Sequence, residues 1–554
     1  MKTKIYITLL AAGALFAACN DLDQFPMGAV ATEEQKEENV KLNPGLASAA
    51  VNSLPSQVNS YMTEYQTHQD YGWASMMLML DMRGQDMPSA LNNYQHYTAA
   101  MELSDFGGRY YDNLYYWNYS YNIIRSANMV VAAVPESDNP ELQYFRANGL
   151  AFRAFAYFNL AQMYQFTYAK NPNALCVPLI LDTNMNETAT SGCARSTVAE
   201  VYEQIVKDLD DAIRLFEAAD QPSEDYPDGV NRVTMSESAN IVKTYASAAV
   251  AYGLRARANL FRCEYAAAAS DAQKAIDLAR VEGIEPYSRT DVAVPAFTDL
   301  NDKSFMWGMY ADESQSEYRG VVNWASHMTG WQTNGYAAAG VYRCINSSLY
   351  GSIEAGDVRK GWWLDGSAKA PASLPGNYAT YITSGVTAAG NSPFPAYAQL
   401  KFGSVGGAPT ASGAIPTPLM RVEEMYLILA EAQGRSTGVA TGMKTLADFV
   451  KTYRNTTDYP YTETNLTDPN MFIDEVWRQR RIELWGEGFA YYDLMRLQKG
   501  LDRRQGGFPA SVVFNLSADN TCLLFDIPQS EIQRNPLIVN GTNNSVIPQP
   551  VEDN

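Results

Sequence analysis

Apolar residues recur every three or four positions along much of the chain, which is the spacing of one buried face of a helix. Residues 110–134 and 141–164 follow this pattern and predict two long helices rich in Tyr, Phe and Ala. Thr197 and Glu200 form a capping box, which predicts a further amphipathic helix directly after Thr197. The pattern therefore predicts a mostly α-helical protein.

The clearest helical hairpin is predicted over residues 237–262 and 265–280. Ala256, Ala268 and Ala275 follow one another at intervals of 12 and 7 residues, which resembles the small-residue positions of a tetratricopeptide repeat. Small residues at these positions let two antiparallel helices approach closely, and stacked pairs then bury a continuous core. We therefore expect repeat-like helix pairs in this half of the chain.

Helical periodicity fades over residues 286–417, where Gly, Pro, Ser, Thr, Trp and Tyr dominate. Long irregular stretches in a compact protein are usually functional or disordered, and this one is too aromatic for disorder. Helices are predicted again at 420–432, around 446–453 and at 472–497, where Gly486 and Gly488 break the last one at a close contact or a turn. The expected organisation is an N-terminal helical region (37–285), a loop-rich ligand-binding region (286–417) and a C-terminal helical region with a tail (418–554).

Residues 1–18 are typical of a secretory signal peptide. Lys2 and Lys4 precede a short apolar run that ends in small residues, and no acidic residue occurs before the run ends. The run is too short to span a bilayer, which takes about 20 residues. The sequence Leu-Phe-Ala-Ala-Cys ending at Cys19 resembles a bacterial lipobox, which implies a lipid on Cys19 and a tether over 19–36. Ordinary secretion with a chance cysteine is the alternative.

The composition is that of an acidic globular protein. The 554 residues carry a formal net charge of −20, and loss of Lys2 and Lys4 with the signal peptide lowers it to −22. We expect no nucleic-acid partner, because binding to phosphates requires a basic protein surface and this chain is acidic. No phosphate-binding loop or dinucleotide fingerprint occurs, so we expect no cofactor. No later segment reaches transmembrane length without charges, which leaves the lipid as the expected anchor.

Cysteine and histidine are scarce. No Cys-x-x-Cys spacing occurs, so a thiolate metal site is not expected, while Cys176 and Cys193 could form a disulfide in an oxidising compartment. The three histidines, at positions 68, 96 and 327, are widely separated in the sequence and match no metal-binding or catalytic-triad spacing.

The run from Glu475 to Leu497 combines an apolar stripe with Arg and Glu residues that need charged or backbone partners if they are buried. It resembles the C-terminal signature of the SusD/RagB family, roughly Arg-Arg-x-Glu-Leu-x-x-Glu-Gly followed by Asp-Leu-x-Arg. The matching residues are Arg480, Arg481, Glu483, Leu484, Glu487, Gly488, Asp493, Leu494 and Arg496. Ala490 and Leu497 depart from the family pattern. Similar likenesses occur at 152–158, 421–432 and 527–537, so the resemblance extends over nearly the whole chain.

The resemblance implies a fold and a role. Members of this family have about four tetratricopeptide-like helix pairs that support a large irregular region. They are outer-membrane lipoproteins that capture oligosaccharides, or peptides in RagB-like members, and act as the lid of a SusC-like TonB-dependent transporter. They are not enzymes. We accordingly expect a surface lipoprotein of the outer membrane, facing the cell exterior, that binds an oligosaccharide.

A sugar site needs flat aromatic faces beside planar polar groups. Two loop stretches offer both, one from Asp81 to Tyr97 and the other from Trp324 to Tyr336, and the resemblance places ligand residues in comparable regions. The candidate ligand-binding residues are Arg83, Asp86, Asn93, Tyr94, Trp324, Trp331, Asn334 and Tyr336. For each of them packing in the core is the competing role. Trp362 and Trp363 form a further aromatic pair that either lines a site or fills the loop core.

Two other functions stay open at this point. Peptide cargo would use the same Tyr and Trp residues, so the sequence does not separate it from sugar cargo. A glycoside hydrolase needs only two facing carboxylates, which an acidic chain can supply anywhere. The segment from Gly434 to Gly438 matches Gly-x-Ser-x-Gly, but the predicted helix before it makes it a helix end and not a nucleophile elbow.

Overall fold

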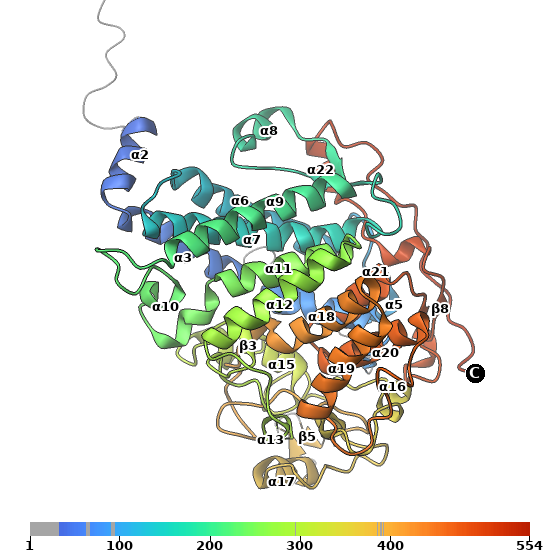
Figure 1. The fold of residues 1–554 in the computed structure, drawn as a ribbon. Coiled ribbons are helices and arrows are strands. Elements are labelled where there is room, and N and C mark those ends of the chain that lie inside the picture. The colour runs from blue at the N-terminus through green and yellow to red at the C-terminus, as the bar shows by residue number, and fades with distance from the viewer. Residues whose placement is uncertain are drawn as a thin grey trace, which may run out of the picture.

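The computed structural model of the protein describes residues 33–61, 67–89, 95–293, 295–384, 386–387, 390–391 and 393–554. Helices dominate, and the strands within these ranges are short and paired only two by two. Figure 1 shows helices from the two halves of the chain side by side, with the loop-rich region gathered at the other end of the molecule. The mostly α-helical prediction is confirmed. The predicted signal peptide, Cys19 and most of the tether lie outside the described residues.

The first half of the chain forms a helical layer with one small sheet, in which β1 (Leu175–Pro178) pairs antiparallel with β2 (Arg195–Thr197). Its helices are α2 (Glu33–Leu42), α3 (Gly45–Val58), α4 (Trp73–Arg83), α5 (Gln95–Glu102), α6 (Tyr111–Ala133), α7 (Pro140–Tyr164), α8 (Met185–Ser191), α9 (Val198–Ala219), α10 (Arg232–Met235), the 3-10 helix η2 (Ala239–Thr244), α11 (Ala248–Phe261) and α12 (Tyr265–Val281).

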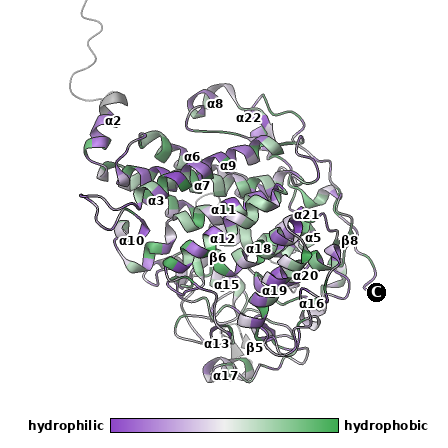
Figure 2. Cartoon of the chain, viewed as in Figure 1, coloured by the Kyte–Doolittle hydropathy of each residue, from purple (hydrophilic) through white to green (hydrophobic). Residues whose placement is uncertain are grey.

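A capping box marks the start of α9 at the predicted position. The Thr197 hydroxyl accepts from the Glu200 amide while the Glu200 carboxylate accepts from the Thr197 amide, so the predicted capping box closes α9. α9 buries one apolar stripe, and Figure 2 shows hydrophilic and hydrophobic residues mixed along its length. The predicted first helix of the hairpin is shorter than expected, because residues 239–244 form η2 and α11 begins at Ala248.

The hairpin of α11 and α12 is held by small residues. Ala256, Ala268 and Ala275 are all fully buried, as the close helix approach requires. Gly253 allows a further close contact, since a Cβ there would lie 2.5 Å from the sulfur of Met420 in the C-terminal half. Close packing at these small residues therefore joins the hairpin to the rest of the molecule.

The middle of the chain is irregular, as predicted, with short elements spaced along it. They are α13 (Arg289–Val292), β3 (Phe305–Met309), α14 (Ser316–Arg319), α15 (Trp324–Met328), α16 (Ser347–Gly351), the 3-10 helix η3 (Val358–Trp362), α17 (Gly376–Ser384), β4 (Val386–Thr387), β5 (Gly390–Asn391) and β6 (Thr417–Arg421). β4 pairs with β5, and β3 pairs antiparallel with β6 from Phe305↔Arg421 to Met309↔Thr417. Both ends of the loop-rich region are thereby fixed beside the helical layer.

The C-terminal part returns to helices and ends in an irregular tail. Its elements are α18 (Val422–Ser436), α19 (Val439–Tyr453), α20 (Pro469–Glu483), α21 (Ala490–Arg496), β7 (Leu501–Asp502), η4 (Ala510–Val512), β8 (Asn515–Leu516), η5 (Thr521–Leu523) and α22 (Gln529–Arg534). β7 pairs antiparallel with β8. Gly486 and Gly488 have φ of 80° and 82° and break the predicted 472–497 helix in two. The Gly-x-Ser-x-Gly segment is the end of α18, as predicted.

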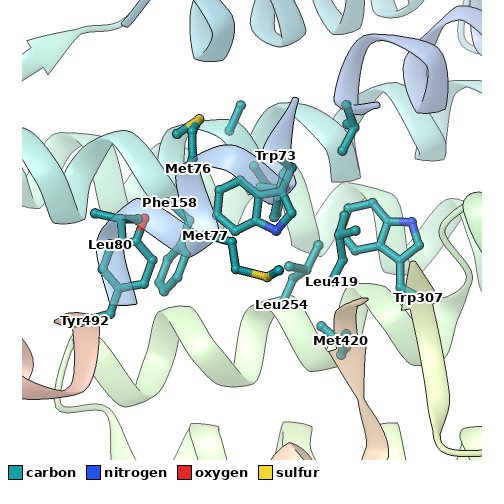
Figure 3. Close-up of a cluster of buried hydrophobic side chains, with 14 of the residues drawn as sticks. Trp73, Met76, Met77, Leu80, Phe158, Leu254, Trp307, Leu419, Met420 and Tyr492 are labelled. Carbon is teal, nitrogen blue, oxygen red and sulfur yellow. The ribbon is translucent and has the colours of Figure 1, made fainter. Parts of the chain in front are cut away.

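The core contains large aromatic and Met side chains from both halves. α4 is buried on every side, so it is a central helix and not a surface one. Figure 3 shows Trp73 and Met77 of α4 beside Leu254 of α11, with Trp307 of β3 nearby. The ring centroids of Trp73 and Phe155 lie 5.0 Å apart in an edge-on contact. The central helix is therefore enclosed by the helical layer and by the start of the loop-rich region.

A network of buried ion pairs surrounds Glu483, whose side chain is fully buried. Arg454 donates to its carboxylate at 2.7 and 2.9 Å, Arg421 at 3.1 Å and Arg359 at 3.2 Å. Burial opposes ionisation of Glu483, but the three guanidinium groups outweigh it and hold its pKa well below the usual range. Of the sequence expectations, pairing of Glu483 is confirmed, although its partners come from three other segments and not from Arg481.

The network extends through Glu487, which accepts from Arg421 at 2.8 Å and from Lys401 at 2.6 Å. Glu423 and Asp357 complete a set of four carboxylates facing four cations, and every one of these side chains is at most 2% exposed. Balanced charge and saturated hydrogen bonding make such burial tolerable. We call this set the Glu483 network.

The thiols Cys176 and Cys193 are both free in this structure, so it contains no disulfide between them. Burial raises the pKa of the Cys176 thiol to about 12, which makes it unreactive. None of the described helices is both long enough and apolar enough to cross a membrane.

The first prediction concerns the Glu483 network. Glu483→Gln keeps the shape of the side chain but leaves three buried guanidinium groups short of a charge, so we expect a loss of about 3–5 kcal/mol in unfolding free energy. Chemical denaturation followed by circular dichroism measures it. The control Glu463→Gln alters an exposed glutamate and should change stability by no more than about 0.5 kcal/mol. Equal stability of the two variants would show that the network does not hold the fold.

Candidate functional site

The two loop stretches singled out in the sequence lie against each other. The Cys344 amide donates to the Pro88 carbonyl at 3.2 Å, and Ser89 forms an antiparallel bridge with Arg343. Farther along, the Tyr97 hydroxyl is hydrogen-bonded to Nδ1 of His327 on α15. Segments separated by more than 200 residues in the sequence therefore pack together in one region of the structure.

All three histidines of the chain lie in this region. The ring centroids of His96 and His327 lie 5.9 Å apart, and Tyr336 packs 4.7 Å from His327 and 5.6 Å from His68. The Tyr336 hydroxyl is hydrogen-bonded to Nδ1 of His68. Tyr97 completes the group, which we call the histidine cluster: His68, His96, Tyr97, His327 and Tyr336. His68 is exposed and Tyr336 half-buried, whereas the other three are buried.

The buried histidines are neutral at neutral pH. Burial, together with the positive charges of Arg343 and His68, lowers the pKa of His96 to about 3. Burial also holds the pKa of His327 well below its usual range, aided by His96, Arg343 and His68 and opposed by the Val321 backbone. The described residues contain no group of three His, Cys, Asp or Glu side chains suited to a metal. The cluster can therefore offer aromatic faces and neutral hydrogen-bonding nitrogens.

A pocket of about 490 Å³ opens where α3, η2 and the end of β3 meet. We call it the tyrosine pocket, because three half-buried tyrosines line it together with amides and one carboxylate. Its lining residues are Asn52, Pro55, Ser56, Asn59, Tyr61, Ile241, Thr244, Tyr245, Met309, Tyr310, Asp312 and Gln315. Flat aromatic rings beside planar amides are the groups that a sugar ring and its hydroxyls require.

Hydrogen bonds hold the walls of the tyrosine pocket. The Tyr245 hydroxyl donates to Oδ1 of Asn52 at 2.8 Å, which ties η2 to α3. Nδ2 of Asn59 donates to the Tyr310 carbonyl at 3.3 Å and to the Tyr318 hydroxyl at 2.8 Å. The side chains are therefore oriented before any ligand arrives, which reduces the entropic cost of binding.

The tyrosine pocket and the histidine cluster flank one segment of chain. Tyr318 packs edge-on against Tyr61 with ring centroids 5.6 Å apart, and the next residue, Arg319, accepts at its carbonyl from Nδ2 of Asn334 at 3.2 Å. Asn334 is exposed and stands two residues before Tyr336. An extended ligand could therefore contact both groups.

Comparison with known families explains this architecture. A family model described as "Starch-binding associating with outer membrane" matches residues 32–258, and one described as "SusD family" matches residues 302–544. The chain belongs to the SusD family. The resemblance seen in the C-terminal signature thus extends to both halves of the chain.

Solved SusD-like structures share the fold over nearly the whole chain. A SusD-like carbohydrate-binding protein from Bacteroides vulgatus is 21% identical with a TM-score of 0.66, covering 89% of this chain and 97% of its own. A laminarin-binding SusD-like protein is 18% identical with a TM-score of 0.58, covering 90% and 99%. Surface glycan-binding protein A from Bacteroides thetaiotaomicron, in complex with laminarihexaose, is 15% identical with a TM-score of 0.59 and the same coverage. No curated protein gave a significant match.

The two charged candidate residues, Arg83 and Asp86, are buried and form structural ion pairs. Arg83 is fully buried, forms an ion pair with Asp105 and donates to the Cys522 carbonyl at 2.8 Å. Asp86 is buried and accepts from Arg481 of the signature at 2.5 Å. Both side chains connect the first loop stretch to the C-terminal part and have no free surface in this structure.

The predicted tryptophans are also buried. Trp331 donates from its indole to the Phe402 carbonyl at 2.8 Å and stacks 5.3 Å from Phe394, while Trp324 packs 4.8 Å from Phe402. Trp362 and Trp363 are each 1% exposed, so they fill the loop core in this structure. Of the remaining candidates, Asn334 and Tyr336 lie at the surface, and Asn93 and Tyr94 fall outside the described residues.

No motif or spacing in the sequence predicts the histidine cluster or the tyrosine pocket. His68, His96 and His327 share no spacing, because tertiary contacts across more than 200 residues bring them together. Tyr245 lies within residues 237–262, which the sequence predicts as one helix, and Tyr310 lies in the irregular stretch 286–417. The high Tyr content was the one available hint, and it does not locate a site.

The second prediction is a pH dependence set by the cluster. Because the folded pKa of His96 and His327 lies below the unfolded value near 6.5, the unfolded state binds more protons below pH 6.5. Stability should therefore fall as the pH drops below 6.5, and His96, whose folded pKa is about 3, should contribute about 2 kcal/mol of the fall at pH 5. Denaturation at pH 7.5 and 5.0 measures the fall, and His96→Gln should reduce it. His68→Gln at the exposed position is the control, and an equal fall in all three proteins would refute the assignment.

Proposed function

We propose that the protein captures an oligosaccharide outside the cell and delivers it to a SusC-like TonB-dependent transporter, acting as its lid. The observation that carries the proposal is the tyrosine pocket, in which Tyr61, Tyr245 and Tyr310 stand beside fixed amides. Family membership supports the same class of ligand, as do two solved structures of this fold, a laminarin-binding SusD-like protein and a surface glycan-binding protein in complex with laminarihexaose.

Anchoring at the outer membrane is part of the proposal. The lipobox ending at Cys19 and the description of the matching family model as associating with the outer membrane support it. Candidate ligand contacts are the lining of the tyrosine pocket with Asn334 and Tyr336 at the rim of the histidine cluster. Asn93 and Tyr94 stay candidates from the sequence.

Binding without catalysis fits the chemistry of the pocket. Among the described lining residues Asp312 is the single carboxylate, whereas glycoside hydrolysis normally uses two. Its pKa is lowered by hydrogen bonds from Ser314, the opposite of what a general acid needs. Reversible capture requires moderate affinity, because the ligand must pass to the barrel.

The third prediction tests the pocket. Calorimetric titration of protein from residue 20 onward with soluble polysaccharides should show binding that Tyr310→Ala and Tyr245→Ala each weaken by roughly tenfold, the effect of losing one stacked ring. Tyr252→Ala removes a half-buried tyrosine of α11 outside the pocket and should leave affinity unchanged. Binding of a peptide digest and of no glycan would move the cargo to the peptide class and overturn the proposal.

The fourth prediction tests the anchor. In a bacterial host with lipoprotein processing, the full chain should fractionate with the outer membrane and incorporate labelled fatty acid, because a lipid on Cys19 supplies the membrane affinity. Cys19→Ala should abolish both. Cys193→Ala, which removes a free thiol of the folded part, is the control. Soluble wild-type protein without label would show that Cys19 is not lipidated.

A further inference from the structure

Arg343 is a buried cation without a counter-charge. Its side chain lies against the histidine cluster and the residue is 1% exposed. Nε donates to the His327 carbonyl at 2.9 Å, Nη1 donates to the Ser89 hydroxyl at 2.8 Å, and the guanidinium lies 4.0 Å from the ring centre of Tyr97. No described carboxylate forms an ion pair with it, and Nη2 has no hydrogen-bond partner among the described residues.

The other buried arginines show how unusual this is. Arg83, Arg257 and Arg421, for example, each face a carboxylate. Of the buried arginines that the structure describes, Arg503 alone shares the lack of an ion pair with Arg343. Arg503 is satisfied differently, because all three of its nitrogens donate to backbone carbonyls. Burying an uncompensated charge with a free N–H is costly, so such a group points to an anion that binds there.

A second unpartnered nitrogen belongs to a residue that contacts the same tyrosine ring. His96 is 8% exposed, and its Nε2 has no hydrogen-bond partner among the described residues. His96 packs 4.0 Å from the ring centre of Tyr97, the same ring that Arg343 covers. The guanidinium is close enough to help lower the pKa of His96. A neutral imidazole can donate from Nε2, so the pair offers two N–H groups and one positive charge, a set suited to a carboxylate.

The position of this pair relates it to the candidate site. His68 and Tyr336, the accessible members of the histidine cluster, cover the buried members. A ligand that reaches the buried nitrogens from this side must part the hydrogen bond between His68 and Tyr336. Asn334, which donates to the Arg319 carbonyl beside Tyr318, lies between this group and the segment that contacts the tyrosine pocket.

We propose that Arg343 and His96 form a subsite for the carboxylate of an acidic sugar, so that the cargo is a uronic-acid-containing oligosaccharide. This inference rests on the proposed function and names its substrate class. The carboxylate accepts from Nη2 of Arg343 and from Nε2 of His96, while the neutral part of the chain occupies the tyrosine pocket. Charge-assisted bonds of this kind give a preference of roughly tenfold to hundredfold for the acid form.

The deciding experiment uses the unmodified protein from residue 20 onward. Oligogalacturonides, alginate oligomers and hyaluronan oligomers are each titrated calorimetrically beside the same oligosaccharide with its carboxyl groups reduced to alcohols. At least one pair should show a preference of about tenfold or more for the acid form. Equal or weaker binding of the acid form in every pair overturns the inference.

Variants then locate the preference. Arg343→Gln should lower the affinity for the acid form to that for the reduced form, so that the preference is lost. Arg343→Lys should restore part of the preference, because Lys keeps the positive charge but not the planar guanidinium. Arg214→Gln removes a charge from a side chain that is 60% exposed, and it should leave the preference intact. A preference that survives Arg343→Gln overturns the assignment. If that variant does not fold, the comparison with unmodified protein still decides.

The two proposals fail in different ways. Binding of neutral or carboxyl-reduced glycans without preference for acids overturns the acidic-sugar subsite and leaves oligosaccharide capture standing. Absence of binding to every glycan, acidic or neutral, with binding of peptides, overturns both.

Discussion

The structure depends on the charge balance around Glu483. A loop-rich region cannot satisfy its own polar groups through regular secondary structure, and here buried ion pairs take that role. Arg359 from the loop region, Arg421 from β6 and Arg454 after α19 converge on one carboxylate of α20. Because each ion is buried, removal of any one would leave its partners uncompensated, which makes the set cooperative. The C-terminal signature is thus the centre to which the irregular chain is tied.

The network also positions the candidate site through a short series of contacts. Nζ of Lys401 donates to the carbonyls of Glu483 and Trp485 and to Glu487. The next residue, Phe402, accepts from the Trp331 indole and packs against Trp324 on α15. α15 carries His327. The histidine cluster is therefore connected, through Phe402 and Lys401, to the buried ion pairs that hold α20. The site can have loops at its surface and still be rigid at its base.

Periodicity and capping predicted the helices because those signals are local. Thr197 and Glu200 fixed the start of α9, and Gly486 with Gly488 fixed the break before α21. The candidate site could not be predicted in this way. In an irregular region the sequence does not distinguish a Trp that fills the core from a Trp that faces a ligand. Trp331 and Trp324 proved to be the packing behind the site. The histidines could not be placed together, since only tertiary contacts relate them.

The acidic surface and the single uncompensated arginine act over different distances. At a net charge near −20 the protein repels an acidic glycan at long range, but that repulsion is screened beyond roughly 8 Å at physiological ionic strength. In the proposed subsite Arg343 would act only after contact, because its side chain is buried and its attraction is there least screened. Such an arrangement gives selectivity through the dissociation rate and not through electrostatic steering.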